Sequence, residues 1–191
     1  IAKIECSEAV ENFEDIIEAA DGVVVARGDL GGEVPARKGP HIQKEIIRAS
    51  NRASKPVITA TQMLDSMMEH PRPTRAETSD IANAIYQGTS AIMLSGETAA
   101  GKYPVRALQT MVRVASYMEQ NINYNEIFKK RDRAEDPDIT NAISHATCMT
   151  AMDLKANIIL AASETGFTAR MISKYRPGCM IGGCSSSRKV C

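Results

Sequence analysis

The sequence has no excess of charge of either sign, because 23 lysines and arginines balance 23 aspartates and glutamates over 191 residues. This balance argues against a nucleic-acid-binding protein that depends on a strong overall field, although it leaves room for a local anion site. The sequence also has no apolar run that approaches the roughly 20 residues of a membrane span. Its first five residues do not form a signal peptide and are typical of the end of a strand. We therefore expect neither nucleic acid nor a membrane as a partner.

Cys-X-X-Cys pairs are absent as well, although the chain has five cysteines. Cys179 and Cys184 are separated by four residues, and the three histidines are far from both in the sequence. This spacing does not favour a zinc site. Free thiols in a reducing compartment are the better interpretation, so we expect a cytoplasmic protein.

The composition that remains is that of an ordinary globular protein, with 43% hydrophobic and 24% charged residues. Its length allows one large or two small domains, each with a core of its own. The last residues stop without a closing secondary-structure element, and we expect the sequence to be a piece of a longer chain.

Strands and helices are expected to alternate along the sequence, as in an α/β protein. Strands are predicted, from β-branched and apolar runs, at residues 1–5, 23–27, 57–61, 90–94, 156–161 and 179–182. Helices are predicted, from apolar residues at helical spacing, at residues 8–20, 41–53, 75–87, 103–120, 139–154 and 169–175. In the helix at 103–120 the predicted apolar stripe comprises Val105, Leu108, Met111, Val112, Ala115 and Met118.

The spacing of the strands predicts a parallel sheet. Val23 and Val57 are 57 − 23 = 34 residues apart, and Val57 and Ala91 are also 91 − 57 = 34 residues apart. One strand and one helix fit into each step, which is typical of repeated βα units; helical repeats of the same length are the alternative. Because no Gly-X-Gly-X-X-Gly run opens a helix, a (β/α)8 TIM barrel is favoured over a doubly wound sheet.

The pattern of alternating strands and helices is interrupted after Gln120. A charged run at 129–136, followed by Pro137, predicts a solvated linker or an exposed helix end. A second α/β region begins at residue 139 and is too short to complete a sheet. We expect residues 1–121 to form the C-terminal half of a barrel domain and residues 122–191 to form the first part of a second α/β domain.

Polar residues gather where the first four predicted strands end. They are Lys3 and Glu5, Arg27 and Asp29, Thr61 and Gln62, and Ser95 and Glu97. The carboxyl ends of parallel strands lie at one face of a barrel, where active sites are built. These residues are therefore the candidates for a functional site.

Two carboxylates and a lysine in this set suggest chemistry on an anion. Glu5 and Asp29 can share a divalent cation, for which Mg²⁺ is the best candidate because the ligands are oxygens. Lys3 lies two residues from Glu5 on the same face of the strand, so it would face a phosphate or a developing oxyanion. Thr61 offers a hydroxyl to the same pocket. The alternatives are an Asp-Gly turn at Asp29 and a plain ion pair between Lys3 and Glu5.

Five strings in the same order resemble one family, the pyruvate kinases. They are KIE (3–5), VARGDLG (25–31), ATQML (60–64), PRPTRAE (71–77) and MLSGETA (93–99). Each string is weak alone, but five at these spacings are specific, and the resemblance runs over essentially the whole chain. It implies a partial barrel, from the end of strand 5 through strand 8, followed by the beginning of the C-terminal domain.

The resemblance also implies transfer of the phosphoryl group of phosphoenolpyruvate to ADP, giving pyruvate and ATP in glycolysis. By the matching motifs, Glu5 and Asp29 are expected to bind Mg²⁺, with Mn²⁺ as the alternative ion. Lys3 is expected to stabilise the phosphoryl and enolate charge, and the amides around Gly28 are expected to cradle the substrate carboxylate. The expected substrate-binding residues are Lys3, Ala26, Gly28, Asp29 and Thr61, and the expected supporting residues are Arg27, Ser95 and Glu97.

The second domain of the family often binds a sugar phosphate such as fructose 1,6-bisphosphate. The matching loop comprises Ser163, Glu164, Thr165, Gly166, Phe167 and Thr168. Its hydroxyls and amides precede a helix and would suit a phosphate, but a simple helix cap needs the same residues. Both interpretations stay open.

The family's other parts have no counterpart in these 191 residues. They include the first four barrel strands, the lid domain, the K⁺ site and much of the nucleotide pocket. Cys6 and Gly39-Pro40 also depart from the family's usual residues, but neither is a proposed ligand. We expect the fragment alone to be inactive and the whole enzyme to be a homotetramer. The alternatives are a related Mg²⁺-dependent barrel that binds phosphoenolpyruvate or an oxoacid, and a non-catalytic fragment that binds only a metal or an effector.

Overall fold

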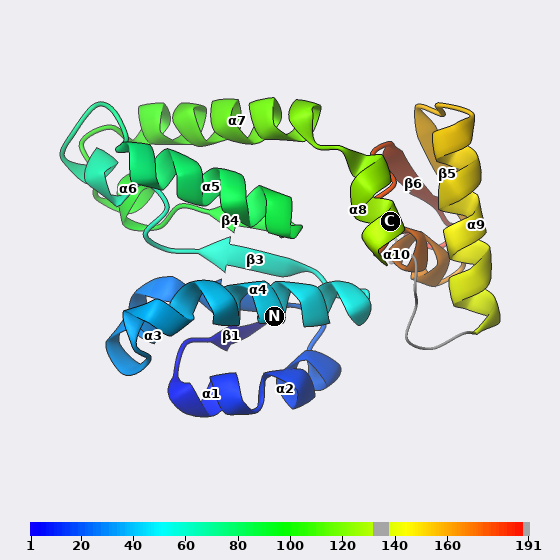
Figure 1. Cartoon of the computed structure of the whole chain (residues 1–191), viewed down its shortest axis with the longest axis horizontal. Helices are drawn as coiled ribbons and strands as arrows, with labels where there is room; N and C mark the ends of the chain where they lie inside the picture. Colours follow the sequence, from blue (N-terminus) through cyan, green and yellow to red (C-terminus); the bar gives the residue numbers. More distant parts are fainter. Residues whose placement is uncertain (132–137, 189–191) are drawn as a thin grey trace. The chain divides into compact units, whose positions relative to one another are not determined.

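The computed structural model describes residues 1–131 and 138–188, with the backbone only at residues 130 and 131. The chain divides into two compact units, Ile1–Ile122 and Asn123–Cys191, which we call the first and the second unit (Figure 1). Each unit has its own apolar core.

The first unit is built on a four-stranded parallel sheet in the order β1-β2-β3-β4. The strands are β1 (Ala2–Ile4), β2 (Val23–Ala26), β3 (Val57–Ala60) and β4 (Ala91–Met93). Ile4 pairs with Val25, and Ala26 pairs with Ala60, so neighbouring strands end at the same edge of the sheet. The parallel sheet predicted from the 34-residue spacing is confirmed.

Helices and 3₁₀ turns follow each of the four strands of the first unit. They are α1 (Ser7–Glu11), α2 (Phe13–Ala19), α3 (Arg27–Glu33), the 3₁₀ turn η1 (Ala36–Lys38), α4 (Gly39–Arg52), the 3₁₀ turn η2 (Asp65–Met68), α5 (Arg75–Gln87), α6 (Gly96–Ala99) and α7 (Pro104–Asn121). The predicted helix at 75–87 is confirmed at both ends. Helix α4 begins two residues earlier than predicted, at Gly39, because Pro40 fits the first turn of a helix, where its missing N–H is not needed.

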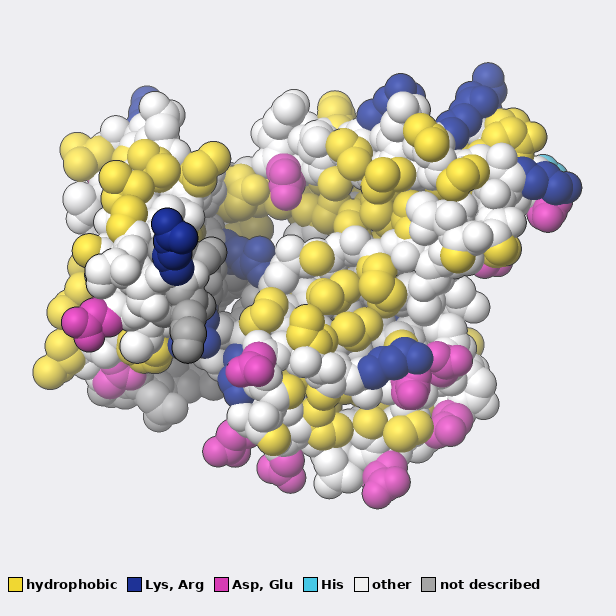
Figure 2. Space-filling model, turned by 180° about the vertical axis from the view of Figure 1, so that it is seen from behind, with side chains coloured by type: hydrophobic (Ala, Val, Ile, Leu, Met, Phe, Trp, Pro, Cys, Tyr) yellow, Lys and Arg dark blue, Asp and Glu magenta, His cyan; other side chains and the backbone are white. Residues whose placement is uncertain are grey.

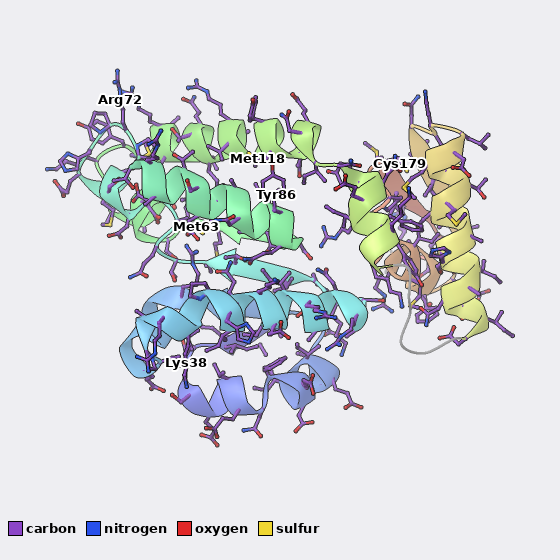
Figure 3. All side chains as sticks on the ribbon, viewed as in Figure 1. Lys38, Met63, Arg72, Tyr86, Met118 and Cys179 are labelled. Atoms are coloured by element: carbon purple, nitrogen blue, oxygen red, sulfur yellow. The ribbon has the colours of Figure 1, made fainter. Side chains whose placement is uncertain are left out.

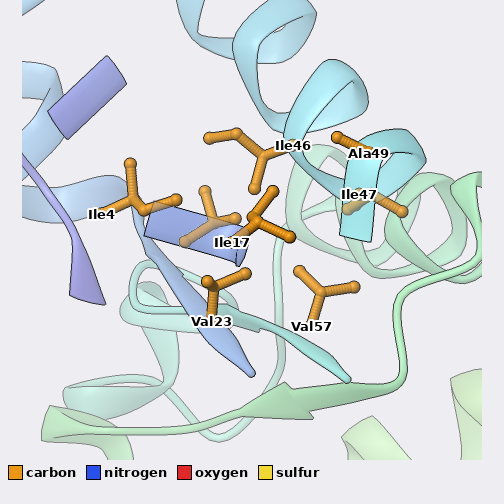
Figure 4. Close-up of a cluster of buried hydrophobic side chains, with 8 residues drawn as sticks. Ile4, Ile17, Val23, Ile46, Ile47, Ala49 and Val57 are labelled. Carbon is orange, nitrogen blue, oxygen red and sulfur yellow. The ribbon is translucent and has the colours of Figure 1, made fainter. Parts of the chain in front are cut away.

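One face of the sheet packs against α2 and α4. Ile4, Val23 and Val57 from the strands meet Ile17 of α2 and Ile46 of α4, and all five side chains are buried (Figure 4). β-branched residues fit this pleated, covered surface, which is why the valine run forms a strand. In the view from behind, apolar side chains form a group at the surface of the first unit (Figure 2).

A second core of the first unit lies around α5 and α7. Its members are Met63, Leu64, Met67, Ile81, Ala84, Ala107 and Met111. It fixes the segment that follows β3, because Met63 and Leu64 are fully buried. The end of β3 is thereby held against α5.

The second unit is a smaller α/β arrangement. Its elements are α8 (Tyr124–Arg131), α9 (Ile139–Asp153), β5 (Ile158–Ala162), α10 (Phe167–Ser173) and β6 (Met180–Cys184). The two strands are parallel, with Ile158 opposite Met180. Its core includes Phe128, Cys148, Ile159, Ile172 and Tyr175.

Two local predictions in the first unit were wrong. The single helix expected at 8–20 is broken at Asn12, whose side-chain amide donates to the Glu8 carbonyl at 2.8 Å and competes with the helical pattern. The turn offered as the alternative at Asp29 is the helix α3, which follows β2 directly. Leu30 is buried, and Glu33 accepts the Ser7 backbone N–H at 2.8 Å, so tertiary contacts outweigh the poor helix propensity of the glycines.

The predicted stripe of α7 was also only partly right. Met111 is buried, whereas Val105, Leu108 and Val112 are exposed. The buried face instead includes Ala107, which the apolar pattern of the sequence did not single out. Apolar residues surround more than one face of this helix, so periodicity alone does not choose the face.

Predictions for the second unit need smaller corrections. In α9 the buried face carries Asn141 and Ser144, while Ile139 and Ile143 are exposed. Helix α10 and strand β6 are displaced by one or two residues from the predicted ranges. Of the charged run at 129–136, the first three residues belong to α8, and residues 132–136 lie outside the described part of the chain.

Candidate active site

The polar residues predicted at the strand ends lie at the carboxyl edge of the parallel sheet. Lys3 belongs to β1, and Glu5 follows that strand directly. Asp29 lies in the first turn of α3, just after β2, and Thr61 is the first residue after β3. The register of the strands brings these positions to one edge because all four strands run in the same direction.

Lys3 joins the two carboxylates at this edge. Its Nζ donates to Asp29 Oδ2 at 3.1 Å and forms an ion pair with Glu5. The hydrogen bond to Glu5, and then that to Asp29, raise the pKa of Lys3, while the Lys3 hydrogen bond and charge lower the pKa of Asp29. The three side chains are 52%, 40% and 62% exposed in the order Lys3, Glu5, Asp29, so a ligand can reach them.

Thr61 links the end of β3 to the start of α3. Its Oγ1 accepts the Gly28 backbone N–H at 2.8 Å and donates to the Ala60 carbonyl at 2.7 Å. The Gly28 amide, expected to cradle a substrate carboxylate, is therefore already engaged by this hydroxyl. Ala26, the last residue of β2, is fully buried.

Arg27 lies between the strand end and Gly28, and its side chain contacts the segment after β3 and helix α5. The guanidinium donates to the carbonyl oxygens of Thr61 and Gln62 and pairs with Asp80 of α5. Arg27 was expected from the sequence to be a supporting residue, whereas Asp80 was not expected at the site. A single charged residue on a helix is usually solvated, so the sequence held no signal for Asp80.

Glu97 is buried, with 2% of its surface exposed. Its two carboxylate oxygens accept the backbone N–H groups of Leu64 and Ser95, both at 2.9 Å. Ser95 thus meets Glu97 through its backbone. Both residues lie in the segment after β4, and their hydrogen bonds fix the segments that follow β3 and β4 rather than join the Lys3 cluster.

The loop matched to an effector site lies in the second unit, between β5 and the start of α10. Ser163 N–H donates to the Cys184 carbonyl at 2.9 Å, which places the loop beside the end of β6. Gly166 has a left-handed φ of 75°, and Phe167 N–H donates to Thr165 Oγ1 at 3.4 Å. Phe167 is exposed, as is Glu164.

Within residues 1–131 and 138–188, no group of three or more His, Cys, Asp or Glu side chains is arranged to hold a metal ion. Glu5 and Asp29 form a two-carboxylate set, so a cation there would need further ligands from a substrate or from water. In the same described part of the chain, no helix is both long enough and apolar enough to cross a membrane.

Comparison with known proteins gives the same family for both units. The family model "Pyruvate kinase, barrel domain" matches residues 1–108, and "Pyruvate kinase, alpha/beta domain" matches residues 141–191. The chain is 54% identical over 187 residues to the pyruvate kinase of Sporosarcina psychrophila, covering 98% of this chain and 32% of the relative. It is 56% identical over 177 residues to that of Bacillus licheniformis, covering 93% of this chain and 30% of the relative.

Solved structures agree with the sequence relatives. A crystal structure of a pyruvate kinase from Cryptosporidium parvum matches 98% of this chain and 38% of its own, with a TM-score of 0.92 and 44% sequence identity. The chain therefore spans about a third of the length of the relatives that it matches.

Proposed function

Because the chain belongs to the pyruvate kinase family, we propose that it is part of an enzyme that transfers the phosphoryl group of phosphoenolpyruvate to ADP in glycolysis, giving pyruvate and ATP. The observation that carries the proposal is the convergence of Glu5 and Asp29 on Lys3 at the carboxyl edge of the sheet. Since the chain spans about a third of its relatives, this activity belongs to a complete enzyme. Residues 1–191 would supply part of the active site of that enzyme.

We propose that the four parallel strands are strands 5 to 8 of a (β/α)8 barrel. The sequential order β1-β2-β3-β4 supports this, because a doubly wound sheet reverses its order at a switch point. In this proposal residues 1–121 complete the barrel and residues 122–191 begin the C-terminal domain.

Glu5 and Asp29 are proposed to hold Mg²⁺, or Mn²⁺ in its place. The donor set fits, because two carboxylates already converge on one cation and Mg²⁺ takes one or two protein carboxylates besides substrate oxygens and water. The bound ion would supply neutralisation of the charge on the transferring phosphoryl group. K⁺ is proposed to bind to parts of the family fold that lie outside residues 1–191.

Lys3 is proposed as the catalytic residue. Its ammonium group is held at the strand end by two carboxylates, which raise its pKa further above neutral pH. A fixed positive charge stabilises the phosphoryl group in transit and the enolate oxygen that it leaves, since phosphoryl transfer depends on positioning and charge neutralisation.

The substrate-binding residues are proposed to be Lys3, Ala26, Gly28, Asp29 and Thr61. The hydroxyl of Thr61 has a second acceptor lone pair besides the one that receives the Gly28 N–H, so it can contact substrate while keeping that bond. Ser95 and Glu97 are proposed to order the site from the neighbouring strand end.

Further properties are proposed from the family resemblance. The loop of residues 163–168 would bind a sugar phosphate, to which its hydroxyl groups offer hydrogen bonds. The complete enzyme would be a homotetramer in the cytoplasm. A binding measurement with fructose 1,6-bisphosphate, comparing the complete enzyme with its Thr165→Ala and Thr168→Ala variants, would test the loop.

The proposed function is tested with a full-length pyruvate kinase in which residues 1–191 replace the matching segment. Pyruvate formation from phosphoenolpyruvate, ADP and Mg²⁺ is followed for this protein, for Lys3→Met and for Lys102→Met. Lys102 is a matched control because it is an exposed lysine paired with a carboxylate, that of Glu69.

We expect Lys3→Met to lose several orders of magnitude in turnover while Lys102→Met keeps full activity, as fits a charge that acts on the transition state. If the unsubstituted protein folds and forms no pyruvate, the kinase assignment is wrong. A related barrel that binds phosphoenolpyruvate or an oxoacid, or a fragment that binds only a metal or an effector, would then remain.

A further inference from the structure

We propose that Arg27 is a positioning residue. Its guanidinium holds the backbone of Thr61 and Gln62 in place, and this backbone in turn keeps the Thr61 hydroxyl in its hydrogen bond with the Gly28 amide. The inference rests on the proposed function, in which Thr61 and Gly28 contact the substrate. Arg27 itself does not reach Lys3, and it would act through these two residues.

The guanidinium of Arg27 binds the backbone of one short segment, Thr61 and Gln62, and we call this set of hydrogen bonds the clamp. Nε donates to the Thr61 carbonyl at 3.1 Å, and Nη2 donates to the carbonyls of Thr61 at 2.8 Å and of Gln62 at 2.9 Å. Nη1 pairs with Asp80, and the sulfur of Met63, labelled in Figure 3, also lies against the guanidinium. The Arg27 side chain is only 15% exposed, so these contacts are shielded from competing water.

The clamped segment has a backbone conformation that it would not hold without support. Thr61 has φ of 66° and Gln62 has φ of 51°, both in the left-handed region. That region is costly for residues other than glycine, and most costly for a β-branched residue such as threonine. Charge-assisted hydrogen bonds to both carbonyl oxygens offset this cost.

The consequence for the site follows from the position of Arg27 in the chain. Its backbone leads directly into Gly28, whose N–H donates to Thr61 Oγ1, while its side chain holds Thr61 from the carbonyl side. The end of β2 and the end of β3 are therefore joined twice, once through each side of Thr61. A change in the Thr61 backbone would move the hydroxyl and release the Gly28 amide together.

An arginine is required for this arrangement because one side chain binds three groups at the same time. The planar fork reaches two successive carbonyl oxygens and, from its other side, Asp80. A lysine at position 27 could pair with Asp80 but could not span both carbonyls in fixed geometry. Arg27→Lys therefore keeps the positive charge at position 27 but removes the paired hydrogen bonds to the carbonyl oxygens of Thr61 and Gln62.

The first experiment measures amide hydrogen exchange in the full-length protein defined above, with residue-level resolution at Gly28. The variants are Arg27→Ala, Arg27→Lys and, as a matched control, Arg52→Ala, an exposed arginine of α4 that faces Glu14 at 3.7 Å. We expect exchange at Gly28 to accelerate by at least about tenfold in both Arg27 variants, with the protection of Val25 in β2 retained. Arg52→Ala should leave both amides unchanged.

The second experiment measures kcat and KM for phosphoenolpyruvate with and without added guanidinium. We expect Arg27→Ala to lose roughly 10²-fold in kcat/KM, because a shift of about 1 Å in a positioned group has this effect. Guanidinium at about 20 mM should restore part of the loss in Arg27→Ala and nothing in Arg52→Ala. A variant that is merely unstable would show no recovery, since guanidinium can only weaken folded structure.

Each outcome decides the proposal. Unchanged exchange at Gly28 in the Arg27 variants overturns it. Loss of activity without rescue, or faster exchange throughout the sheet, also overturns it, because a purely structural role would give that result. If Arg27→Ala does not fold, Arg27→Lys supplies the same readings. If the unsubstituted protein makes no pyruvate, the proposed function fails, and exchange at Gly28 still decides whether Arg27 holds the two strand ends together.

Discussion

The carboxylate of Glu97 accepts the backbone N–H of Leu64 at 2.9 Å, although 33 residues separate them in the chain. Its other oxygen accepts the Ser95 N–H at the same distance. A single buried side chain thus ties the segment after β3 to the segment after β4. Burial of this polar side chain is tolerated because both of its oxygens receive amide hydrogen bonds.

Replacing Glu97 with glutamine tests this tie with almost no change in shape. The glutamine NH₂ group cannot accept a hydrogen bond, so one buried amide loses its partner. We expect the free energy of unfolding to fall by about 1–3 kcal/mol. Urea unfolding followed by circular dichroism measures it, with Glu119→Gln on the exposed side of α7 as the control. Equal stability of the two variants would contradict the expectation.

Glu77 gives the fold a pH dependence. Burial acts to raise its pKa, but hydrogen bonds from Ser66 and Thr74 outweigh burial and bring the pKa below the usual 4.5. The stabilisation is therefore complete above pH 4.5 and is lost as the pH falls through the lowered pKa. We expect Glu77→Gln to be less stable than the unsubstituted chain by about 1 kcal/mol at pH 7, with the difference vanishing in acid.

This pH dependence is read from unfolding curves at several pH values between neutral and acid. Glu119→Gln serves again as the control, because its exposed side chain should show no such convergence. A Glu77→Gln deficit that stays constant down to low pH would show that the carboxylate charge is not what stabilises this end of α5.

Cys148 should behave as an inert thiol. Burial, and next the neighbouring Cys179, raise the pKa of Cys148 to about 12. At pH 8 a thiol with this pKa is thiolate in only about 10⁻⁴ of molecules, and alkylation requires the thiolate. We expect iodoacetamide to modify the exposed Cys184 in the native chain and to modify Cys148 only in urea.

Mass spectrometry of peptides after brief labelling distinguishes these cysteines. Cys179, labelled in Figure 3, packs against the same core as Cys148 but is only half-buried, so it should react at an intermediate rate. Native labelling of Cys148 as fast as that of Cys184 would mean that the core of the second unit is open to solvent.

The proposed metal site predicts that replacing Asp29 raises the concentration of Mg²⁺ that the enzyme needs for activity. In the full-length protein, removal of divalent ions with EDTA should abolish pyruvate formation and added Mg²⁺ should restore it. Asp29→Asn should raise the Mg²⁺ concentration for half-maximal activity by at least roughly tenfold, the lower end of what changes around metal sites cause. Asp15→Asn, an exposed aspartate of α2, is the control. An unchanged Mg²⁺ dependence in Asp29→Asn would exclude Asp29 as a ligand.

The sequence was most informative where local signals determine the structure. Helix α5 has both of its predicted ends, and the structure shows that local contacts set them: Thr74 and Glu77 form a capping box, and Gly88 ends the helix with φ of 89°. The meeting of Lys3 with Asp29 was predictable because parallel strands with equal spacing must end at one edge. Their roles toward a substrate remain a prediction.

Features set by tertiary contacts could not be predicted. Helix α3 contains Gly28, Gly31 and Gly32, which argue against a helix, and it forms because Leu30 is buried and Glu33 reaches Ser7. The clamp of Arg27 depends on left-handed backbone at Thr61 and Gln62. Threonine and glutamine rarely adopt that conformation, so no pattern in the sequence predicts it at these positions.

The order of the strands has a consequence for how the chain is made. In the first unit each strand pairs with the one that precedes it, so every new strand meets a partner that has already left the ribosome. β2 can dock on β1, β3 on β2 and β4 on β3 during synthesis, and none of them must wait for a distant segment. Translation can therefore assemble this sheet progressively, from one side to the other.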